Sequence, residues 1–451
     1  MSSLRTVVVV GGGTAGCTVA GSLAMDENIS VVLLEAGADL GNVQDRDFFQ
    51  VLKNKDDSIS HLQVSLTETS STANYLQAKG LGGGSAINAM VSLPGHADGY
   101  NEWAREFGCT EWAWASVAQA FDGLPLALHR PNDDELGIMG AALLECIPQA
   151  QRSPLAWHNG RQSAAMFLDQ DSRKGALEVR LNATVSRVVI KDGKAVGVEL
   201  SEGNIIPADL VVLCGGALVT PQILWASDIA RPAIGSGLQD HPAVMLGTVL
   251  NAPAADGFVV TAHAFIEIDG VADAGQIMAY NYVGDTSRTL GGLGVALTHV
   301  WSRGKISTDG SDVKIQFNML SDQRDRQAFR SLVRQAAKLV ATGGLSKVGL
   351  DWTCDDKATP CGVLLEMQDN ELDSWLMSNL GHQSHPVGTC RMGEFEDALA
   401  VVSHRGQVHG TSGLWVADAS VFPKIPRANT NLPVTMLASR IAGFILDFCR
   451  S

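Results

Sequence analysis

The stretch VVVVGGGTAGCTVAGSLA, residues 7–24, decides the fold of this chain. Four valines lead into a glycine turn and then into small residues, so we expect a buried strand, a tight turn and a closely packed helix. Gly11, Gly13 and Gly16 fill the GxGxxG spacing. The first glycine permits the turn, the second lets the backbone approach a pyrophosphate, and the third lets helix and strand pack together. The pattern predicts a dinucleotide site at the helix N-terminus.

A second expected strand, SVVLLEAG at residues 30–37, places a carboxylate where the ribose would lie. Glu35 follows Gly16 by 19 residues, and a carboxylate at this point can accept both ribose hydroxyls. Its charge disfavours a 2′-phosphate. We expect Thr14 and Ala15 at the helix start and Ala36 beside Glu35 to complete this end of the site. The motif alone is common to FAD and NAD sites.

Composition excludes several classes of function. The chain has 451 residues, which favours two joined domains, and a formal net charge of -15 with no dense Lys/Arg run, so we expect no nucleic-acid partner. No stretch reaches the ~18 uninterrupted apolar residues of a membrane span. The eight cysteines are scattered without a CxxC pair. We expect free thiols and a cytoplasmic location. Cys354 and Cys361 are close enough in sequence to form a disulfide, and the sequence leaves this alternative open.

A second glycine cluster follows in AKGLGGGSAIN, residues 78–88. Four glycines stand in five positions, and a backbone this thin can lie flat against a planar or phosphate group. Simple NAD dehydrogenases do not require such a cluster, whereas a flavoprotein must hold a pyrophosphate and an isoalloxazine. FAD is therefore favoured, and the expected contacts in and after the cluster are Gly82, Gly83, Ser85, Asn88, Ala89 and Met90.

At this point the sequence resembles the glucose-methanol-choline (GMC) oxidoreductases, which are FAD-dependent alcohol oxidases and dehydrogenases. AKGLGGGSAIN and GHADGYNEWA (95–104) are similar to the family's second signature, with Gly84 in place of its first serine. The likeness continues in the family's order through residues 181–200, 208–224, 235–242, 414–423 and 429–446. The resemblance implies further FAD contacts at Val185, Cys214, Gly215, Asp418, Ala419, Asn431 and Thr435, with the Val185 backbone at the adenine.

Two departures from the family pattern affect the expected site. Some covalently flavinylated members carry a histidine before the asparagine of the second signature, and this chain has Ile87 there, so we expect non-covalent FAD. The chain is also shorter than most members, around residues 38–75 and 125–165. Because these stretches would line the entrance, we expect either an open substrate pocket or one completed by a second subunit in a homo-oligomer.

The stretch GHQSHPVGTCRMG, residues 381–393, contains the expected base. Oxidation of an alcohol by hydride transfer needs a group that takes the hydroxyl proton, and neutral histidine suits this role near neutral pH. In the family this base is the histidine of HPVGT, which corresponds to His385. The family's second active-site position is His or Asn, and here it is Asn429. The resemblance implies that Asn429 anchors the hydroxyl.

Other interpretations of the motif have less support. His382 and His385 stand three apart, but no third ligand has a typical spacing and Pro386 interrupts a helix, so we expect no metal. A pair of Cys390 with His385 lacks an identifiable oxyanion hole. A plain core histidine remains the alternative for His385, and helix capping remains one for Asn429.

The expected fold class is α/β, with a discontinuous Rossmann-like FAD-binding domain and an α+β substrate domain, the GMC fold related to that of p-hydroxybenzoate hydroxylase. We assign residues 1–95, 165–242 and 380–451 to the FAD-binding domain. Residues 96–164 and 243–379 form the substrate or cap domain, an antiparallel sheet backed by helices.

The leading functional hypothesis is oxidation of a primary or secondary alcohol to the carbonyl by hydride transfer to flavin N5. Oxygen reactivity depends on charge and access near the flavin, so the sequence leaves O2 and another electron acceptor open. Two alternatives stay open as well: a lyase of hydroxynitrile type that uses FAD structurally, and a non-catalytic FAD-binding subunit. The sequence does not specify the alcohol.

Overall fold

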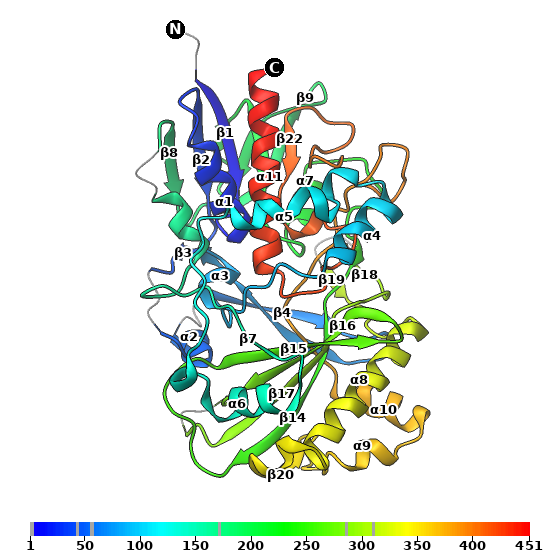
Figure 1. Cartoon of the computed structure of the whole chain (residues 1–451). Coiled ribbons are helices and arrows are strands. Elements are labelled where there is room, and N and C mark those ends of the chain that lie inside the picture. The colour runs from blue at the N-terminus through cyan, green and yellow to red at the C-terminus, as the bar shows by residue number, and fades with distance from the viewer. Residues whose placement is uncertain (1–3, 42–44, 55–57, 170–172, 285–286, 309–311) are drawn as a thin grey trace.

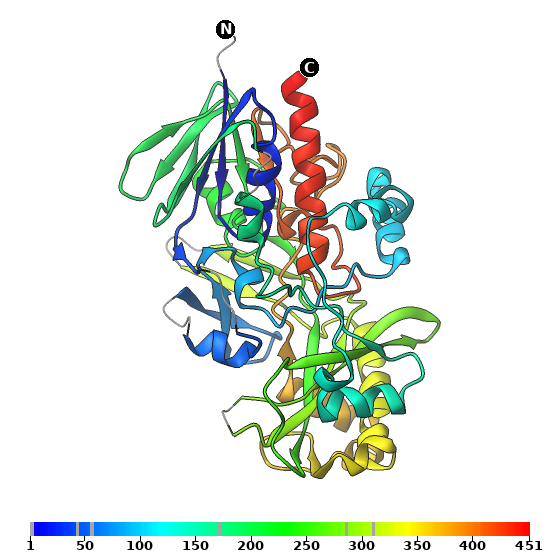
Figure 2. The ribbon, with the colours of Figure 1, turned by 60° about the vertical axis from the view of Figure 1, so that its left-hand side comes forward.

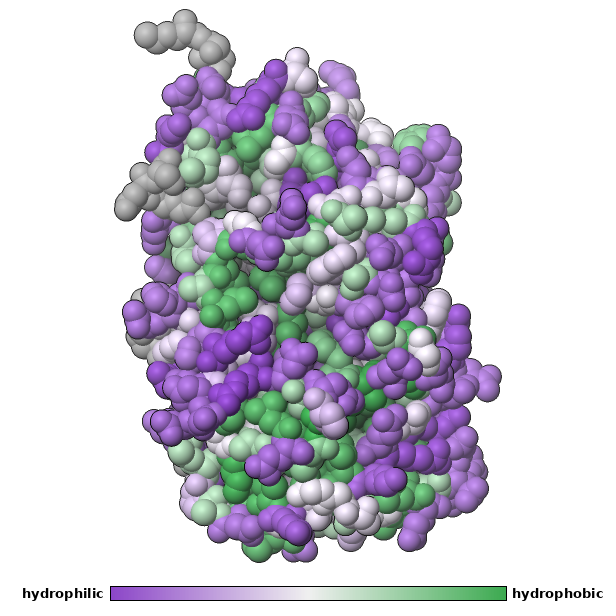
Figure 3. Space-filling model, viewed as in Figure 1, coloured by the Kyte–Doolittle hydropathy of each residue, from purple (hydrophilic) through white to green (hydrophobic). Residues whose placement is uncertain are grey.

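The computed structural model describes residues 4–41, 45–54, 58–169, 173–284, 287–308 and 312–451. A parallel sheet and the long C-terminal helix occupy one end of the molecule, and a large antiparallel sheet with its helices occupies the other. A smaller sheet lies between them (Figures 1 and 2). On the face shown in Figure 3, hydrophilic side chains predominate along the outline, and apolar ones gather in patches nearer the middle. The functional site lies where the three parts meet.

Five parallel strands form the first sheet, in the order β22 (Leu414–Val416), β12 (Leu210–Leu213), β1 (Arg5–Val10), β2 (Ile29–Leu34) and β8 (Ala176–Arg180). The central strand β1 carries the four valines of the opening motif, each at most 4% exposed. A strand that is apolar on both faces is typical of a parallel sheet covered on both sides. The strands come from distant parts of the chain, which confirms the expected discontinuous Rossmann-like domain.

Two helices pack against each other beside this sheet, α1 (Thr14–Leu23) and α11 (Asn431–Arg450). The small residues of α1 allow close packing, since a Cβ added at Gly16 would lie 1.7 Å from the carbonyl oxygen of Gly11. Among the described residues only α11 has the length and apolar composition of a membrane span, and 56% of that window is buried inside the protein. Core helices commonly meet the same criteria.

A three-stranded antiparallel sheet extends this domain, in the order β11 (Ile205–Pro207), β10 (Lys194–Leu200) and β9 (Val185–Lys191). Helix α7 (Thr220–Ala226) packs against β9.

The middle sheet combines distant segments in the order β13 (Ser236–Leu238), β18 (Gly304–Thr308), β19 (Val313–Gln316), β4 (Ile59–Ser65) and β5 (Thr72–Ala78). Beside it, β3 (Ala38–Asp39) pairs with β6 (Gly80–Leu81), and the short helices are α2 (Phe48–Asn54) and α3 (Gly84–Ile87). Because β18 and β19 pair with strands expected in the FAD-binding domain, the boundary at residue 243 does not separate two independent sheets.

The substrate domain is built on a seven-stranded sheet in the order β20 (Gly349–Thr353), β14 (Pro242–Leu250), β17 (Leu290–Leu297), β16 (Val271–Tyr280), β15 (Val260–Ile268) and β7 (Gln151–Arg152), with β21 (Gly381–His382) pairing with β14. Its helices are α6 (Gly137–Cys146), α8 (Gln323–Ala341), α9 (Val363–Glu366) and α10 (Asp369–Asn379). Helix α8 begins at the capping side chain of Asp322 and buries one apolar face on the sheet. The expected antiparallel sheet backed by helices is confirmed.

One expected assignment is corrected by the packing. Residues 96–164 were expected in the substrate domain, but helices α4 (Ala97–Phe107) and α5 (Trp114–Asp122) belong to the core of the FAD-binding domain. The reason is the burial of large aromatic side chains: Trp103 of α4 is 0% exposed and its ring lies 5.0 Å from that of Phe422.

Candidate active site

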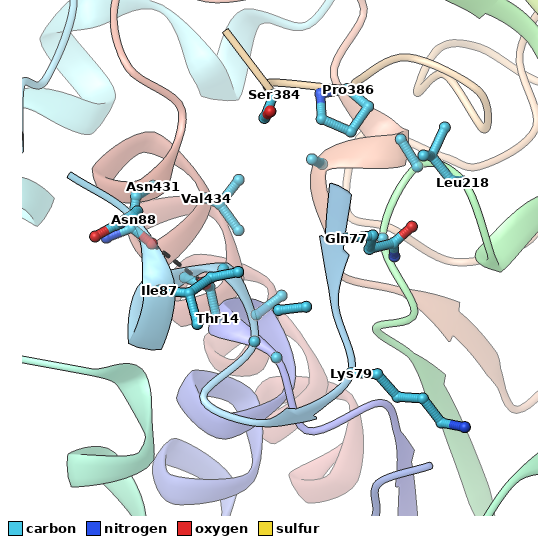
Figure 4. Close-up of a pocket in the computed structure, with 18 of the residues that line it drawn as sticks. Thr14, Gln77, Lys79, Ile87, Asn88, Leu218, Ser384, Pro386, Asn431 and Val434 are labelled. Carbon is cyan, nitrogen blue, oxygen red and sulfur yellow. Dashed lines mark hydrogen bonds between the residues drawn. The ribbon is translucent and has the colours of Figure 1, made fainter. Parts of the chain in front are cut away.

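A long cavity of about 640 Å³ brings both glycine clusters together with His385 and Asn429. Figure 4 shows part of its wall, with Thr14, Asn88 and Asn431 on one side and Gln77, Leu218 and Pro386 on the other. The predicted cofactor-binding residues that line it are Gly11, Gly13, Thr14, Ala15, Glu35, Ala36, Gly83, Asn88, Ala89, Met90, Val185, Cys214, Gly215, Asp418, Ala419 and Asn431.

The two glycine clusters touch each other in the wall of the cavity. The Gly82 N–H donates to the carbonyl oxygen of Gly12 over 2.7 Å, and a Cβ added at Gly83 would lie 2.6 Å from the Cα of Gly13. Gly83 has a φ of 53°, a conformation that favours glycine. Helix α1 begins here without a side-chain cap, so its first N–H groups are available to an anion. This is a cradle for a diphosphate.

Four predicted cofactor-binding residues lie outside the lining of the cavity: Gly16, Gly82, Ser85 and Thr435. Ser85 Oγ donates to the Gly82 carbonyl over 2.6 Å, and Thr435 Oγ1 donates to the Asn431 carbonyl over 2.9 Å. These hydrogen bonds support the wall, and the assignment of the four residues as direct cofactor contacts stays a prediction.

Two carboxylates of the wall hold backbone loops in place. Glu35 accepts the Gly12 N–H over 2.6 Å and the Gly37 N–H over 2.8 Å. Asp418 accepts the Gly216 N–H over 2.8 Å and the Thr220 hydroxyl over 2.6 Å. Glu35 still lines the cavity beside Val185, as a residue that binds a ribose must.

The last helix docks onto the first glycine turn. Thr14 Oγ1 lies 3.1 Å from Asn431 Oδ1, the contact drawn as a dashed line in Figure 4. The stretch before the helix carries Asn429, so this docking brings Asn429 to the same cavity as the N-terminal motif. Asn429 Oδ1 accepts a hydrogen bond from Gln276 Nε2 of β16 over 3.2 Å. Among the described residues the N–H groups of Asn429 have no hydrogen-bond partner, so they can donate to a ligand in the cavity.

His385 lines the cavity from the loop after β21. Its backbone N–H donates to Asp240 Oδ1 over 3.0 Å, and its Nδ1 lies 3.0 Å from Nδ1 of His241. Burial, followed by the facing charges of His241 and His382, lowers the pKa of His385 well below its ordinary value. His385 is therefore neutral near pH 7 and can accept a proton.

His382 and Cys390 are part of the surrounding scaffold. The His382 ring stacks on Tyr75 with centroids 4.3 Å apart, and its Nδ1 lies 4.0 Å from a carboxylate oxygen of Asp240. Burial raises the pKa of the Cys390 thiol, which makes it a poor nucleophile. All the cysteines are free thiols in the structure, including Cys354 and Cys361.

Among the described residues, the structure brings together one group of side chains that could hold a metal, a group that the sequence did not indicate. Ligand atoms of Asp240, His241 and His385 all lie within 4.8 Å of one another. Their hydrogen bonds account for this proximity: Asp240 accepts from two backbone N–H groups and from the Tyr75 hydroxyl, and the two histidines bond to each other. The Nδ1 atoms of both histidines and the carboxylate oxygens of Asp240 are therefore already hydrogen-bonded within the protein.

The sequence did not indicate the residues that support the two predicted catalytic side chains. His241 lies in the stretch GSGLQDHP (235–242), but nothing local links it to His385, which is 144 residues away. Gln276 and the cavity-lining Met278 and Tyr280 lie on β16, whose apolar sequence carries no motif. Their position at the cavity follows only from the pairing of the strands in the sheet of the substrate domain.

Comparison with known proteins agrees with this geometry. The N-terminal GMC oxidoreductase family model matches residues 6–142 and 145–243, and the C-terminal GMC oxidoreductase model matches residues 301–438. The chain belongs to the GMC oxidoreductase family. The resemblance described from the motifs is thereby confirmed.

Curated relatives of this GMC oxidoreductase span nearly its whole length. It is 29% identical to a 5-(hydroxymethyl)furfural oxidase of a Methylovorus species, covering 97% of this chain and 98% of the relative. It is 26% identical to an oxygen-dependent choline dehydrogenase of Photobacterium profundum, covering 99% of this chain and 94% of the relative.

Solved structures share the fold at lower identity. Pyridoxine 4-oxidase from Mesorbium loti has a TM-score of 0.84 at 22% identity and covers 98% of this chain and 99% of that chain. A variant of Aspergillus oryzae formate oxidase has a TM-score of 0.86 at 20% identity, with complete coverage of both chains.

FAD is the cofactor of this family, and the cavity of this GMC oxidoreductase fits it. A Cβ added at Gly13 would have only the Cα of Gly83 within 4 Å, at 3.9 Å, so the absence of a side chain at Gly13 leaves open space beside the N-terminus of α1. Farther along the wall, Gln77 Oε1 is buried without a hydrogen-bond partner among the described residues, and an amide oxygen of this kind can accept from a ring N–H. The protein is an FAD-dependent oxidoreductase.

Proposed function

We propose that this GMC oxidoreductase oxidises an uncharged, largely apolar primary or secondary alcohol to the corresponding carbonyl compound. His385 takes the hydroxyl proton, and Asn429 holds the hydroxyl oxygen. The observation that carries the proposal is that both side chains line the cavity whose glycine cradle fits FAD. FAD, held non-covalently, accepts the hydride when bound.

His385 suits the role of proton acceptor, and Asn429 suits the role of hydrogen-bond donor. His385 is neutral near pH 7 because burial lowers its pKa, so it accepts a proton as the alcohol is oxidised. Asn429 cannot accept a proton, but its amide N–H groups can donate to an oxygen that gains negative charge. Holding the oxygen between these two groups orients the carbinol carbon.

The remaining cavity wall favours a substrate without charge. Its apolar members include Met90, Val91, Val260 and Met278. The Asp, Glu, Lys and Arg side chains among the lining residues are Glu35, Lys79 and Asp418. Both carboxylates are bonded to backbone amides, and Figure 4 shows Lys79 extending away from the other labelled side chains.

The two curated relatives are named for substrates of different charge, and the cavity wall favours one of these two substrate classes. The Methylovorus relative is named for an uncharged alcohol, and the Photobacterium relative is named for choline, a quaternary ammonium ion. A buried cation needs a carboxylate or an aromatic cage. The aromatic side chains of the lining are Phe48, Tyr75 and Tyr280, and the Tyr75 ring already stacks on Phe317 and His382. Both lining carboxylates already accept backbone N–H groups, so we favour the uncharged class for this chain.

The proposal is tested by mixing the yellow holoprotein anaerobically with a panel of alcohols. Uncharged aromatic and aliphatic alcohols should bleach the flavin absorbance, and choline should not. His385→Gln should slow the bleaching by about 10²- to 10⁴-fold with unchanged FAD content. The base assignment is wrong if this variant bleaches as fast as the wild type. Repeating the reaction in air with peroxide detection distinguishes an oxidase from a dehydrogenase.

The pH dependence provides a further check on the same reaction. Because the pKa of His385 lies below 6.5, the rate of flavin reduction should rise with pH through that lowered pKa and be level at pH 7. Cyanide release from a cyanohydrin without bleaching would instead indicate the lyase, and FAD binding with neither reaction would indicate a non-catalytic subunit.

A further inference from the structure

Three hydrogen-bonding groups form a chain that ends at the cavity. The carbonyl oxygen of Pro426 lies 3.1 Å from Nε2 of His241, and Nδ1 of His241 lies 3.0 Å from Nδ1 of His385. His241 is 1% exposed and does not line the cavity, whereas His385 does. Each contact constrains where the ring protons lie.

The protonation of His241 follows from its first neighbour. A carbonyl oxygen only accepts hydrogen bonds, so Nε2 of His241 must carry the proton that faces Pro426. Burial lowers the pKa of His241 to about 4 against the opposing effect of the Pro426 and Thr298 carbonyls, so the ring holds one proton near neutral pH. Of these two carbonyls, that of Pro426 lies 3.1 Å from Nε2 and accepts the hydrogen bond from this proton. Nδ1 of His241 is consequently an unprotonated acceptor.

The protonation of His385 follows in turn. Its Nδ1 faces the acceptor nitrogen of His241, so it must be the donor of the 3.0 Å contact. His385 is also neutral, which leaves its Nε2 without a proton. Among the described residues Nε2 of His385 has no hydrogen-bond partner, and the ring lines the cavity.

We propose that His241 is a positioning residue that holds His385 as the Nδ1–H tautomer, so that the basic Nε2 faces the substrate hydroxyl. The Pro426 carbonyl sets the orientation of this relay. The inference rests on the proposed function for the role of His385 as base, while the tautomer itself depends on the hydrogen bonds and on the neutral state of the two rings.

The same contacts stabilise the protonated state formed during the reaction. The proton leaves the substrate oxygen and joins Nε2 of His385, whose Nδ1–H then donates a charge-assisted hydrogen bond to His241. The Asp240 carboxylate accepts the backbone N–H groups of both histidines, over 3.0 Å from His385 and 2.7 Å from His241. The other groups facing this cluster are His382 of β21 and the Tyr75 hydroxyl of β5.

The tautomer can be measured directly. In holoprotein labelled with ¹⁵N-histidine, NMR shifts distinguish a protonated ring nitrogen from an unprotonated one, and His385→Gln identifies the signals of His385. We expect Nδ1 protonated and Nε2 unprotonated at pH 7.5. The opposite assignment for His385 in the wild-type protein would overturn the inference, whatever the activity.

Variants of His241 then test its effect on the reaction. His241→Leu removes the acceptor and should slow anaerobic flavin reduction by at least about tenfold with unchanged FAD content. His241→Asn can accept through Oδ1 and should recover most of the rate and the Nδ1–H signal. His263→Leu is the matched control, because His263 is another buried histidine, bonded to Ser153 outside the site.

The outcomes separate the inference from the proposed function. Equal rates for His241→Leu and the wild type would refute the positioning role. A wild-type protein that no alcohol reduces, but that shows the expected tautomer, would count against the proposed function and leave the relay established.

Discussion

Gln276 acts on the substrate only through its neighbour Asn429. It is 2% exposed on β16, and its Nε2 donates to Asn429 Oδ1 over 3.2 Å. This bond determines which end of the Asn429 amide faces the cavity. A donor is the end that stabilises an oxygen gaining negative charge.

Two substitutions at this position test the orientation of the amide. Gln276→Met removes the donor and lets the amide turn, so we expect flavin reduction to slow by about three- to tenfold. Gln276→Glu presents an acceptor of similar shape, which turns the Asn429 oxygen toward the substrate, and its loss should be larger. Stopped-flow reduction is measured beside FAD content and Tm. Wild-type rates in both variants would show that the amide is oriented by other contacts.

A local sequence pattern predicts His385 but not the residues that orient it and Asn429, because those residues lie far away in the sequence. The motif around His385 predicts a base because the local residue types are unusual. The tautomer of that base depends on His241, 144 residues away, and the direction of the Asn429 amide depends on Gln276, 153 residues away. Such pairs form only when the two sheets pack, and no local pattern records them.

At the scale of elements, the two glycine turns work as one unit. The turn before α1 and the turn before α3 approach so closely that Gly83 has room only for hydrogen. The diphosphate cradle therefore depends on the contact between two separate loops. A side chain at Gly83 would push the loops apart.

Gly83→Ala should weaken FAD binding for this reason. We expect the variant to purify with a reduced ratio of flavin absorbance to protein absorbance and to lose FAD on dialysis. Gly193→Ala is the matched control: Gly193 also has a positive φ, 74°, but a Cβ there would have nothing within 4 Å. The control carries the backbone strain, about 1–2 kcal/mol, without the steric overlap. Equal FAD retention by the two variants would argue against the cradle.

The elements also differ in how far the sequence predicts them. The first strand, turn and helix follow from residues 7–24 because each step has a local cause. The middle sheet does not, since β4 pairs with the distant β19, and the alternating strands of both are compatible with other partners. The domain of helices α4 and α5 is not predictable for a similar reason, because an amphipathic pattern shows which face of a helix is buried but not which element covers that face.

At the scale of the whole molecule, a buried cluster of charges joins the main parts of the fold. Glu102 of α4 accepts from Lys424 over 2.9 Å and from Arg427, both in the stretch that leads to Asn429. His299, which follows β17 of the substrate sheet, lies 2.8 Å from the Lys424 ammonium. Burial alone would raise the pKa of Glu102, but the neighbouring His299 and Lys424 outweigh it and lower the pKa to about 2.

Removing this one carboxylate should destabilise the molecule far more than removing a similar carboxylate at the surface. Glu102→Gln leaves two buried cations without their counter-ion, which costs about 3–5 kcal/mol. Glu111→Gln is the control, because Glu111 pairs with the exposed Arg405 and such pairs contribute about 0–1 kcal/mol. Tm of the FAD-loaded proteins at pH 7 should therefore fall clearly for the first variant and little for the second.

Since the pKa of Glu102 is lowered on folding, its contribution is complete above about pH 4.5 and is lost as the pH falls toward about 2. The difference in unfolding free energy between Glu102→Gln and the wild type should shrink over the same range, and a constant difference would show that the charge of Glu102 is not its cause.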